Sequence, residues 1–204
     1  MIDLGFICEV LARFEGKAIL RGYVPCIKGA WFPGDGDKGE ALGCSGVTVG
    51  TGVDLGQQSV VLLRLMGLPE ILIEKLAPYC GRYKAIAIAF LNNNPLVLSP
   101  EEARLLDEAV HKHFIKQTSV LFGRERFEAA PKEAQAVAVS LHYQFGTPRR
   151  SASPALEKAW NALREGNYGK AAAFLRNREL WGVAHKPYMS RREAEAALLE
   201  GMSN

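Results

Sequence analysis

The chain has 204 residues, of which 48% are apolar, 23% charged and 9% aromatic, and its formal net charge is +3. These proportions exclude a collagen-like, coiled-coil or wholly disordered chain, and this length suffices for one sizeable core or two small lobes. The charge is too small to indicate nucleic-acid binding. It suits an anionic polymer as partner, and it is equally compatible with an unspecialised soluble surface.

No segment approaches the roughly 18 apolar residues of a membrane span, and residues 1–20 lack a basic stretch followed by an apolar one. We therefore expect synthesis in the cytoplasm without a Sec signal. The cysteines are Cys8, Cys26, Cys44 and Cys80. They contain no CxxC pair, so we expect free thiols, no metal and no cofactor, with a Cys26–Cys44 disulfide after export as the alternative.

The N-terminal half changes character twice. Apolar residues at helical spacing predict a first helix over residues 2–14, which ends near Gly16. Residues 22–56 then hold ten of the chain's 20 glycines, a density typical of turns, hairpins and sites built on loops. Within this segment, Val47–Val53 alternates weakly and predicts a short strand.

The rest of the chain is predicted to be helical. Ser99-Pro100-Glu101-Glu102 has the residues of a helix start, and 131–144 is apolar nearly all round, which predicts a buried central helix. Further helices are expected over 57–66, 69–78, 82–90, 99–118, 153–165, 167–176 and 190–200. The prediction is an α+β fold, mostly α, in a single domain 1–204, with a glycine-rich lobe over 1–56 and a helical lobe over 57–204.

Two stretches combine side chains suited to glycosidic chemistry. Glu15 ends the first helix, and residues 45–57 carry Thr48 and Asp54 on a glycine-rich turn. Cleavage of a glycosidic bond needs one protonated carboxyl for the leaving oxygen and a second carboxylate as base or nucleophile. A glutamate at a helix end is more often a solvated surface group, so the spacing alone leaves both interpretations open.

The amino-acid sequence of these stretches resembles that of a known family. EGK at 15–17, YVP at 23–25 and SGVTVGTGVDLGQ at 45–57 resemble the phage-type lysozymes, in particular their pesticin-like bacterial toxin branch, which includes type VI secretion lysozyme effectors. The resemblance continues in four later segments, 99–114, 138–146, 163–177 and 188–201. It implies a phage-lysozyme-like fold.

The resemblance also assigns catalytic residues. Glu15 matches the family's general acid, Thr48 its strand threonine, and Asp54, six residues further on, the catalytic aspartate of the pesticin-like branch. Common phage lysozymes place the aspartate before the threonine, where this chain has Leu42. The loop acids Asp35, Asp37 and Glu40 therefore remain alternatives, within an apparent insertion at 26–44 beside the cleft.

The remaining candidates concern water and substrate. The Thr48 hydroxyl is expected to lie exposed in the cleft and to hold the attacking water, as in an inverting hydrolase. Gly50 and Gly52 leave room for a sugar near the backbone. Gln57 and Gln144 are candidates for binding N-acetyl groups, or else ordinary capping or surface amides, and Tyr23 either lines the cleft or packs in the core.

Two other groups of residues bear on metal binding and on the attraction of a charged polymer. His111 and His113 lie two residues apart on a helix with no third ligand nearby, which argues against a metal site. Arg149–Arg150 and Arg191–Arg192 are expected to be solvated or to form salt bridges at the core's edge, and in a lysozyme they also attract an anionic wall polymer.

The resemblance implies a muramidase that cleaves the β-1,4 bond between N-acetylmuramic acid and N-acetylglucosamine in peptidoglycan. The toxin-like motif favours a type VI secreted effector, a monomer acting in the periplasm and cell wall of a target bacterium and blocked by a cognate immunity protein. The alternatives are a phage endolysin, a lytic transglycosylase, which needs only one carboxylate, and a non-catalytic wall-binding module.

Overall fold

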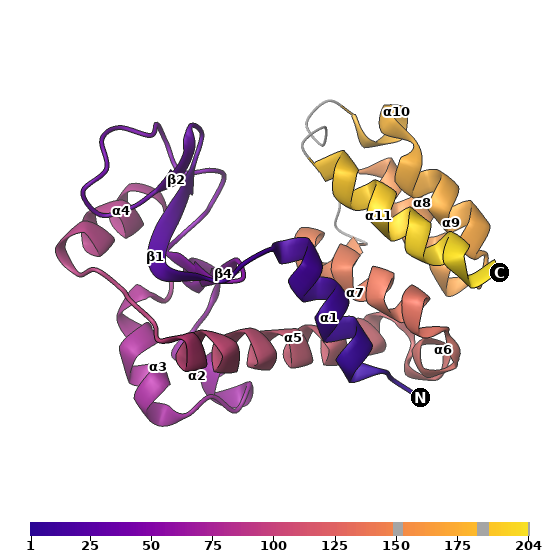
Figure 1. Cartoon of the computed structure of the whole chain (residues 1–204), viewed down its shortest axis with the longest axis horizontal. Coiled ribbons are helices and arrows are strands. Elements are labelled where there is room, and N and C mark those ends of the chain that lie inside the picture. The colour runs from indigo at the N-terminus through magenta and orange to yellow at the C-terminus, as the bar shows by residue number, and fades with distance from the viewer. Residues whose placement is uncertain (149–152, 183–187, 204) are drawn as a thin grey trace. The chain divides into compact units, whose positions relative to one another are not determined.

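The computed structural model describes residues 1–148, 153–182 and 188–203, and it is mostly helical with one small antiparallel sheet (Figure 1). This confirms the α+β, mostly α class. The chain divides into two compact units, which we call the helical unit (Met1–Phe14 and His113–Asn204) and the sheet unit (Glu15–Lys112). The lobe boundary predicted at residue 56 differs from this division, because the helices between 57 and 112 group with the sheet.

The sheet has the strand order β2-β1-β3-β4, and each neighbouring pair is antiparallel. Its strands are β1 (Ile19–Cys26), β2 (Gly29–Trp31), β3 (Thr48–Gly50) and β4 (Val53–Asp54). The single strand predicted over Val47–Val53 is therefore a hairpin. Gly50 and Gly52 have φ of +65° and +92°, values that glycine adopts without strain, and they turn the chain back on itself.

The two faces of the sheet differ in chemistry. Tyr23 pairs with Thr48, and Thr48 pairs with Asp54, so these three side chains stand on one face in a row across β1, β3 and β4. The neighbouring positions Val49 and Val53 pair on the other face and are buried there. The strand pattern thus separates an apolar core face from a face that carries polar groups.

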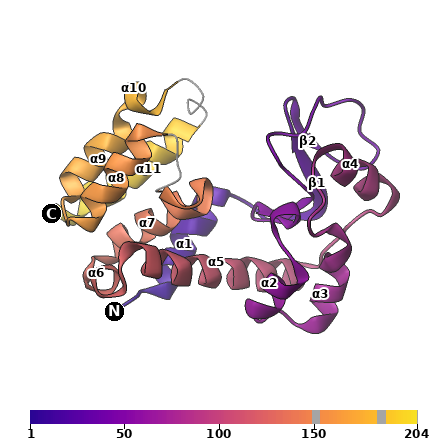
Figure 2. The same ribbon diagram turned by 180° about the vertical axis from the view of Figure 1, so that it is seen from behind.

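Helices complete the sheet unit (Figure 2). They are α2 (Val60–Leu65), α3 (Glu70–Leu76), α4 (Lys84–Asn93) and the first part of α5 (Pro100–Phe122), with short 3-10 turns η1 (Leu55–Gln57) and η2 (Ala77–Tyr79). The start of α5 is the predicted capping arrangement: Glu102 N–H donates to Ser99 Oγ, and Ser99 N–H donates to Glu102 Oε2.

The helical unit is built around α7 (Lys132–Phe145). Every residue from Ala134 to His142 is buried, as predicted for the central helix. The surrounding elements are α1 (Leu4–Glu15) up to Phe14, the end of α5, α6 (Arg124–Ala129), α8 (Pro154–Arg164), α9 (Tyr168–Arg176), α10 (Arg178–Trp181), α11 (Met189–Glu200) and the 3-10 turn η5 (Gly201–Ser203). The short helices α6 and α10 were not predicted. Among the described residues, no helix has the length and apolarity needed to cross a membrane.

A polar network lies inside this unit. Arg192 and Glu195 are both 0% exposed, and Arg192 Nη2 donates to Glu195 Oε1 at 2.7 Å and to Gln144 Oε1 at 2.6 Å. Arg191 donates to Ser140. Arg191–Arg192 therefore forms buried or nearly buried ion pairs with Glu195, whereas Arg149–Arg150 lies outside the described residues.

Candidate active site

The polar row on the sheet is the centre of the candidate site. It combines Asp54 at the end of β4, Thr48 at the start of β3 and Tyr23 in β1. Antiparallel register fixes which side chains share a face, so the three are brought together by strand pairing and not by a flexible loop.

Asp54 is held by backbone donors. Its Oδ1 accepts from Gly56 N–H at 2.8 Å and from Gly46 N–H at 3.1 Å, and its Oδ2 also faces Gly46 N–H at 3.2 Å. The side chain thereby caps η1, which is the structural role expected of an aspartate at this position. Burial raises the pKa of Asp54, and the N–H groups of Gly46, Gly56 and Gln57 oppose that increase. A raised pKa makes the carboxylate a better proton acceptor.

The burial of Thr48 differs from the prediction. Its side chain is not exposed in a cleft, because the residue is only 3% exposed. The hydroxyl makes one long hydrogen bond, to Gly46 O at 3.4 Å. The reason is its position in the middle of a three-strand row, flanked by Tyr23 and Asp54 on the neighbouring strands.

Glu15 is the last residue of α1, where Gly16 with φ of +80° ends the helix. Its Oε2 reaches the β3–β4 turn, since a Cβ built on Gly52 would lie 3.4 Å from it. Burial raises the pKa of Tyr23, and the charges of Glu15 and Asp54 raise it further. Both carboxylates are therefore close enough to act electrostatically on the same phenol.

A further acid, Asp107 of α5, belongs to this cluster and was missed in the sequence. Its Oδ1 accepts from Thr51 N–H at 3.0 Å, in the β3–β4 turn. Burial raises the pKa of Asp107, and the charge of Glu15 contributes to the increase. A signal was available: Asp107 shares the apolar face of its helix with Ala103 and Val110, four residues before and three after it. An acid on a buried face needs a partner.

Asp107 also explains one of the glycines. A Cβ at Gly50 would lie 2.4 Å from Asp107 Oδ1, so the fold itself requires glycine at this position. The space beside Gly50 is filled by a side chain of this chain, which differs from the expectation that it is kept open for a sugar. Beside Gly52, the nearest atom is the Glu15 carboxylate.

The two candidate amides lie in different units. Gln57 is in the sheet unit, and its Nε2 donates to Cys44 O at 3.0 Å. Gln144 is in the helical unit, where its Oε1 accepts from the buried Arg192. Each amide therefore has a hydrogen-bond partner within its own unit.

The loop acids have different surroundings from Asp54. The Asp37 side chain is 82% exposed and pairs with Lys28, and Asp35 accepts from Phe32 N–H in a local turn. The hydrogen bond from Gly39 N–H and the charge of Lys28 lower the pKa of Asp37, which makes it a weaker base. Cys26 and Cys44 do not form the disulfide considered as the alternative, and Cys8 and Cys80 are not in disulfides either.

The two candidate histidines, His111 and His113, both lie on α5. Burial lowers the pKa of His111 to about 4, so its ring is neutral at physiological pH. Across the described parts of the chain, no group of three or more histidine, cysteine, aspartate or glutamate side chains has the geometry to hold a metal ion.

Comparison with known proteins gives one family. A family model for pesticin, described as the C-terminal part of a bacterial toxin homologue of phage lysozyme, matches residues 1–169. A search of curated proteins gives no significant match. The match covers the whole sheet unit, α1, α5 and the buried α7. The chain therefore belongs to the pesticin family of phage-lysozyme homologues, and its general class is that of a lysozyme-like peptidoglycan hydrolase.

Proposed function

We propose that the protein is a muramidase that hydrolyses the β-1,4 bond between N-acetylmuramic acid and N-acetylglucosamine. The observation that carries the proposal is the arrangement around the β3–β4 turn. Glu15 Oε2 reaches Gly52 at one end of the turn, and Asp54 follows two residues later, next to Thr48. Two carboxylates beside one short turn are what a glycoside hydrolase requires.

In this proposal Glu15 is the general acid. It stands on the last turn of a helix, so its backbone is fixed by α1. Its proton goes to the glycosidic oxygen as the bond to the anomeric carbon breaks, which leaves a hydroxyl on the departing sugar.

Asp54 is the base, and Thr48 positions the water. Of the two Asp54 oxygens, Oδ1 accepts the two shorter bonds and Oδ2 the longer contact to Gly46 N–H, so Oδ2 keeps more capacity to accept a proton from water. The Thr48 hydroxyl donates to Gly46 O, and its oxygen can accept from the same water. Attack from the face opposite the leaving group gives an inverted product. Tyr23, Gly52 and Gln57 are proposed as contacts to the sugars.

The test is Glu15→Gln, which is nearly isosteric and cannot donate a proton. We expect it to fold and to lose about 100- to 10,000-fold of the rate on purified sacculi. Mass spectrometry of the wild-type digest should show reducing-end muramic acid. Anhydro-muramic acid would instead identify a lytic transglycosylase, and binding of wild-type protein to sacculi without soluble products would indicate a wall-binding module.

For the biological role we propose an antibacterial effector, delivered by type VI secretion and held in check by an immunity protein that covers the Glu15–Asp54 region. The family description as a bacterial toxin supports this over an endolysin. The test is expression in a Gram-negative host with and without an added export signal. We expect lysis only with export, and protection by a periplasmic protein encoded beside the gene. Holin and tail genes as neighbours would favour the endolysin.

A further inference from the structure

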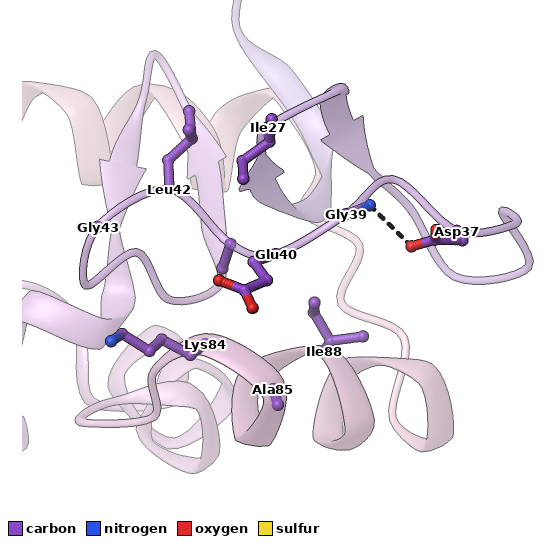
Figure 3. A pocket seen from close by; sticks show the side chains of 10 residues that line it. Ile27, Asp37, Gly39, Glu40, Leu42, Gly43, Lys84, Ala85 and Ile88 are labelled. Atoms are coloured by element: carbon purple, nitrogen blue, oxygen red, sulfur yellow. Dashed lines mark hydrogen bonds between the residues drawn. The ribbon is translucent and has the colours of Figure 1, made fainter.

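The sheet unit has a cavity that lies outside the polar row. It is a cavity of about 900 Å³ between the segment 37–43 and the first turns of α4 (Figure 3). Figure 3 shows Glu40 pointing from the segment toward α4, with Ala85 and Ile88 on the helix opposite. Ile27 and Leu42 line the segment side, and both are exposed to solvent. This volume lies within the range of small-ligand sites.

The wall of this cavity is held by the sheet. Ile27 N–H donates to Glu40 O at 3.0 Å, Lys28 N–H to Lys38 O at 3.0 Å, and Leu42 N–H to Pro25 O at 2.9 Å. The segment expected as an insertion beside the cleft therefore runs along the end of β1 like an additional edge strand. A wall fixed in this way can present side chains to a ligand at low entropic cost.

The cavity is connected to the candidate catalytic row by a few hydrogen bonds. Lys84 N–H, at the cavity, donates to Ser45 O at 2.9 Å. The next residue, Gly46, donates its N–H to Asp54. Gly43 lines the cavity, and Cys44 after it accepts from Gln57. A polymer bound at Asp54 would thus have the cavity close beside it.

The chemistry of the lining selects the ligand. Glu40 supplies a carboxylate and Lys84 an ammonium group, and Ile27, Leu42 and Ile88 add aliphatic side chains to the lining. Asp37 is already paired with Lys28. No aromatic side chain among the described residues lines this cavity to stack on a sugar ring. Side chains of opposite charge beside aliphatic ones suit a short peptide with free amino and carboxyl groups.

Lys84 has an unusual backbone for its position. Its φ is +52°, and among the described residues it is the sole non-glycine with a positive φ. This conformation is strained for a residue that is not glycine. The strain fixes the direction of the first turn of α4, from which the Lys84 side chain extends at the cavity.

We propose that this cavity binds the peptide stem of peptidoglycan while the glycan lies at Asp54. Glu40 accepts from the ammonium group of the stem's diamino acid, and Lys84 donates to a stem carboxylate. The aliphatic lining residues contact the aliphatic chain of the diamino acid. The enzyme then distinguishes peptide-bearing strands from bare glycan. This inference rests on the proposed muramidase function.

The test is the double variant Glu40→Gln/Lys84→Met, which removes both charges and keeps side-chain length. Its matched control is Asp35→Asn/Lys38→Met, which likewise removes one acidic and one basic charge, at positions near the cavity that do not line it. Both are assayed on intact sacculi and on glycan strands from which an amidase has removed the peptides. We expect the double variant to raise KM about tenfold on peptide-bearing strands and to leave bare glycan unchanged. Equal effects of both variants, or no change on peptide-bearing strands, would overturn the proposal.

A second measurement does not depend on catalysis. Free stem tetrapeptide, with a C-terminal D-alanine after the diamino acid, is titrated into the wild-type protein and followed by NMR of methyl groups. We expect shifts at Ile27, Leu42 and Ile88 that the double variant loses. If the wild type binds the tetrapeptide but cleaves neither substrate, the muramidase proposal fails and the peptide site stands. If no methyl shift occurs at millimolar peptide, the peptide site fails regardless of activity.

Discussion

Replacement of Asp54 by asparagine separates its capping role from its proposed catalytic role. In the structure the carboxylate accepts from Gly56 N–H and Gly46 N–H through Oδ1, and faces Gly46 N–H again through Oδ2. The asparagine oxygen can keep the two Oδ1 bonds. Its NH₂ group then faces Gly46 N–H, donor against donor, and cannot accept a proton from water.

The expected cost in stability is small. Hydrogen bonds to a charged acceptor contribute roughly 1 kcal/mol more than neutral ones, so two of them lose about 2 kcal/mol. Burial of the Asp54 charge is unfavourable, as its raised pKa indicates, and the variant recovers part of that loss. The net cost is about 1 kcal/mol, which lowers the melting temperature of a chain of this size by about 2–4 °C.

The expected cost in activity is large, about 100-fold or more, because a general base is lost. The assay is the rate of reducing-end release from sacculi, with the melting temperature measured on the same samples. Asp35→Asn and Asp37→Asn serve as controls and should stay active, since both acids lie in the exposed loop. An Asp54→Asn enzyme of near wild-type rate, beside an inactive Asp35→Asn or Asp37→Asn, would refute the assignment and move the second carboxylate into the loop.

Three further predictions follow from the same region. Thr48→Val keeps the buried β-branched shape and removes the hydroxyl, so we expect the rate of sacculus digestion to fall about 10- to 100-fold with little change in melting temperature. A large drop in melting temperature at normal specific activity would show that the hydroxyl is structural. Gly50→Ala places a Cβ 2.4 Å from Asp107 Oδ1 at a φ of +65°, which should lower the free energy of unfolding by about 2–4 kcal/mol. At Gly67, where φ is +81° and the space is open, the same substitution should cost about 1 kcal/mol. Equal costs would contradict the close approach of Asp107. Burial raises the pKa of Asp107 in the folded state above 3.8, its ordinary value, so ionisation of Asp107 lowers the free energy of unfolding as pH rises from the ordinary pKa to the raised one. In denaturant unfolding at about pH 4 to 7, the stability of Asp107→Asn relative to the wild type should therefore increase with pH. The opposite trend would contradict the raised pKa.

The sequence by itself determined most of the helices and the class of the fold, although it did not indicate α6 and α10. Helical spacing of apolar residues located α1, α7, α8, α9 and α11 to within a few residues, and Ser99 with Glu102 located the start of α5. These features are local, because periodicity and capping depend on residues within one or two turns. The motif around 45–57 also predicted the family that the comparison confirms.

Only the tertiary structure decided how the polar groups meet. Val47–Val53 proved to be a hairpin, and strand register placed Thr48 inside a row where it is buried. Asp107 comes from a helix more than fifty residues away in the chain and fixes the turn through Thr51. Neither fact has a local signature, since register and burial depend on partners that are distant in sequence.

The same reason applies to the cavity at residues 37–43. Its sequence, rich in glycine and charge, predicts a loop, yet its backbone bonds to the end of β1 and faces α4, which follows about forty residues later. Hydrogen bonds between distant backbone segments leave no pattern in the side chains, because the donors and acceptors are the same for every residue. The sequence therefore determined which chemical groups this protein carries, and the pairing of distant segments determined which of them stand together.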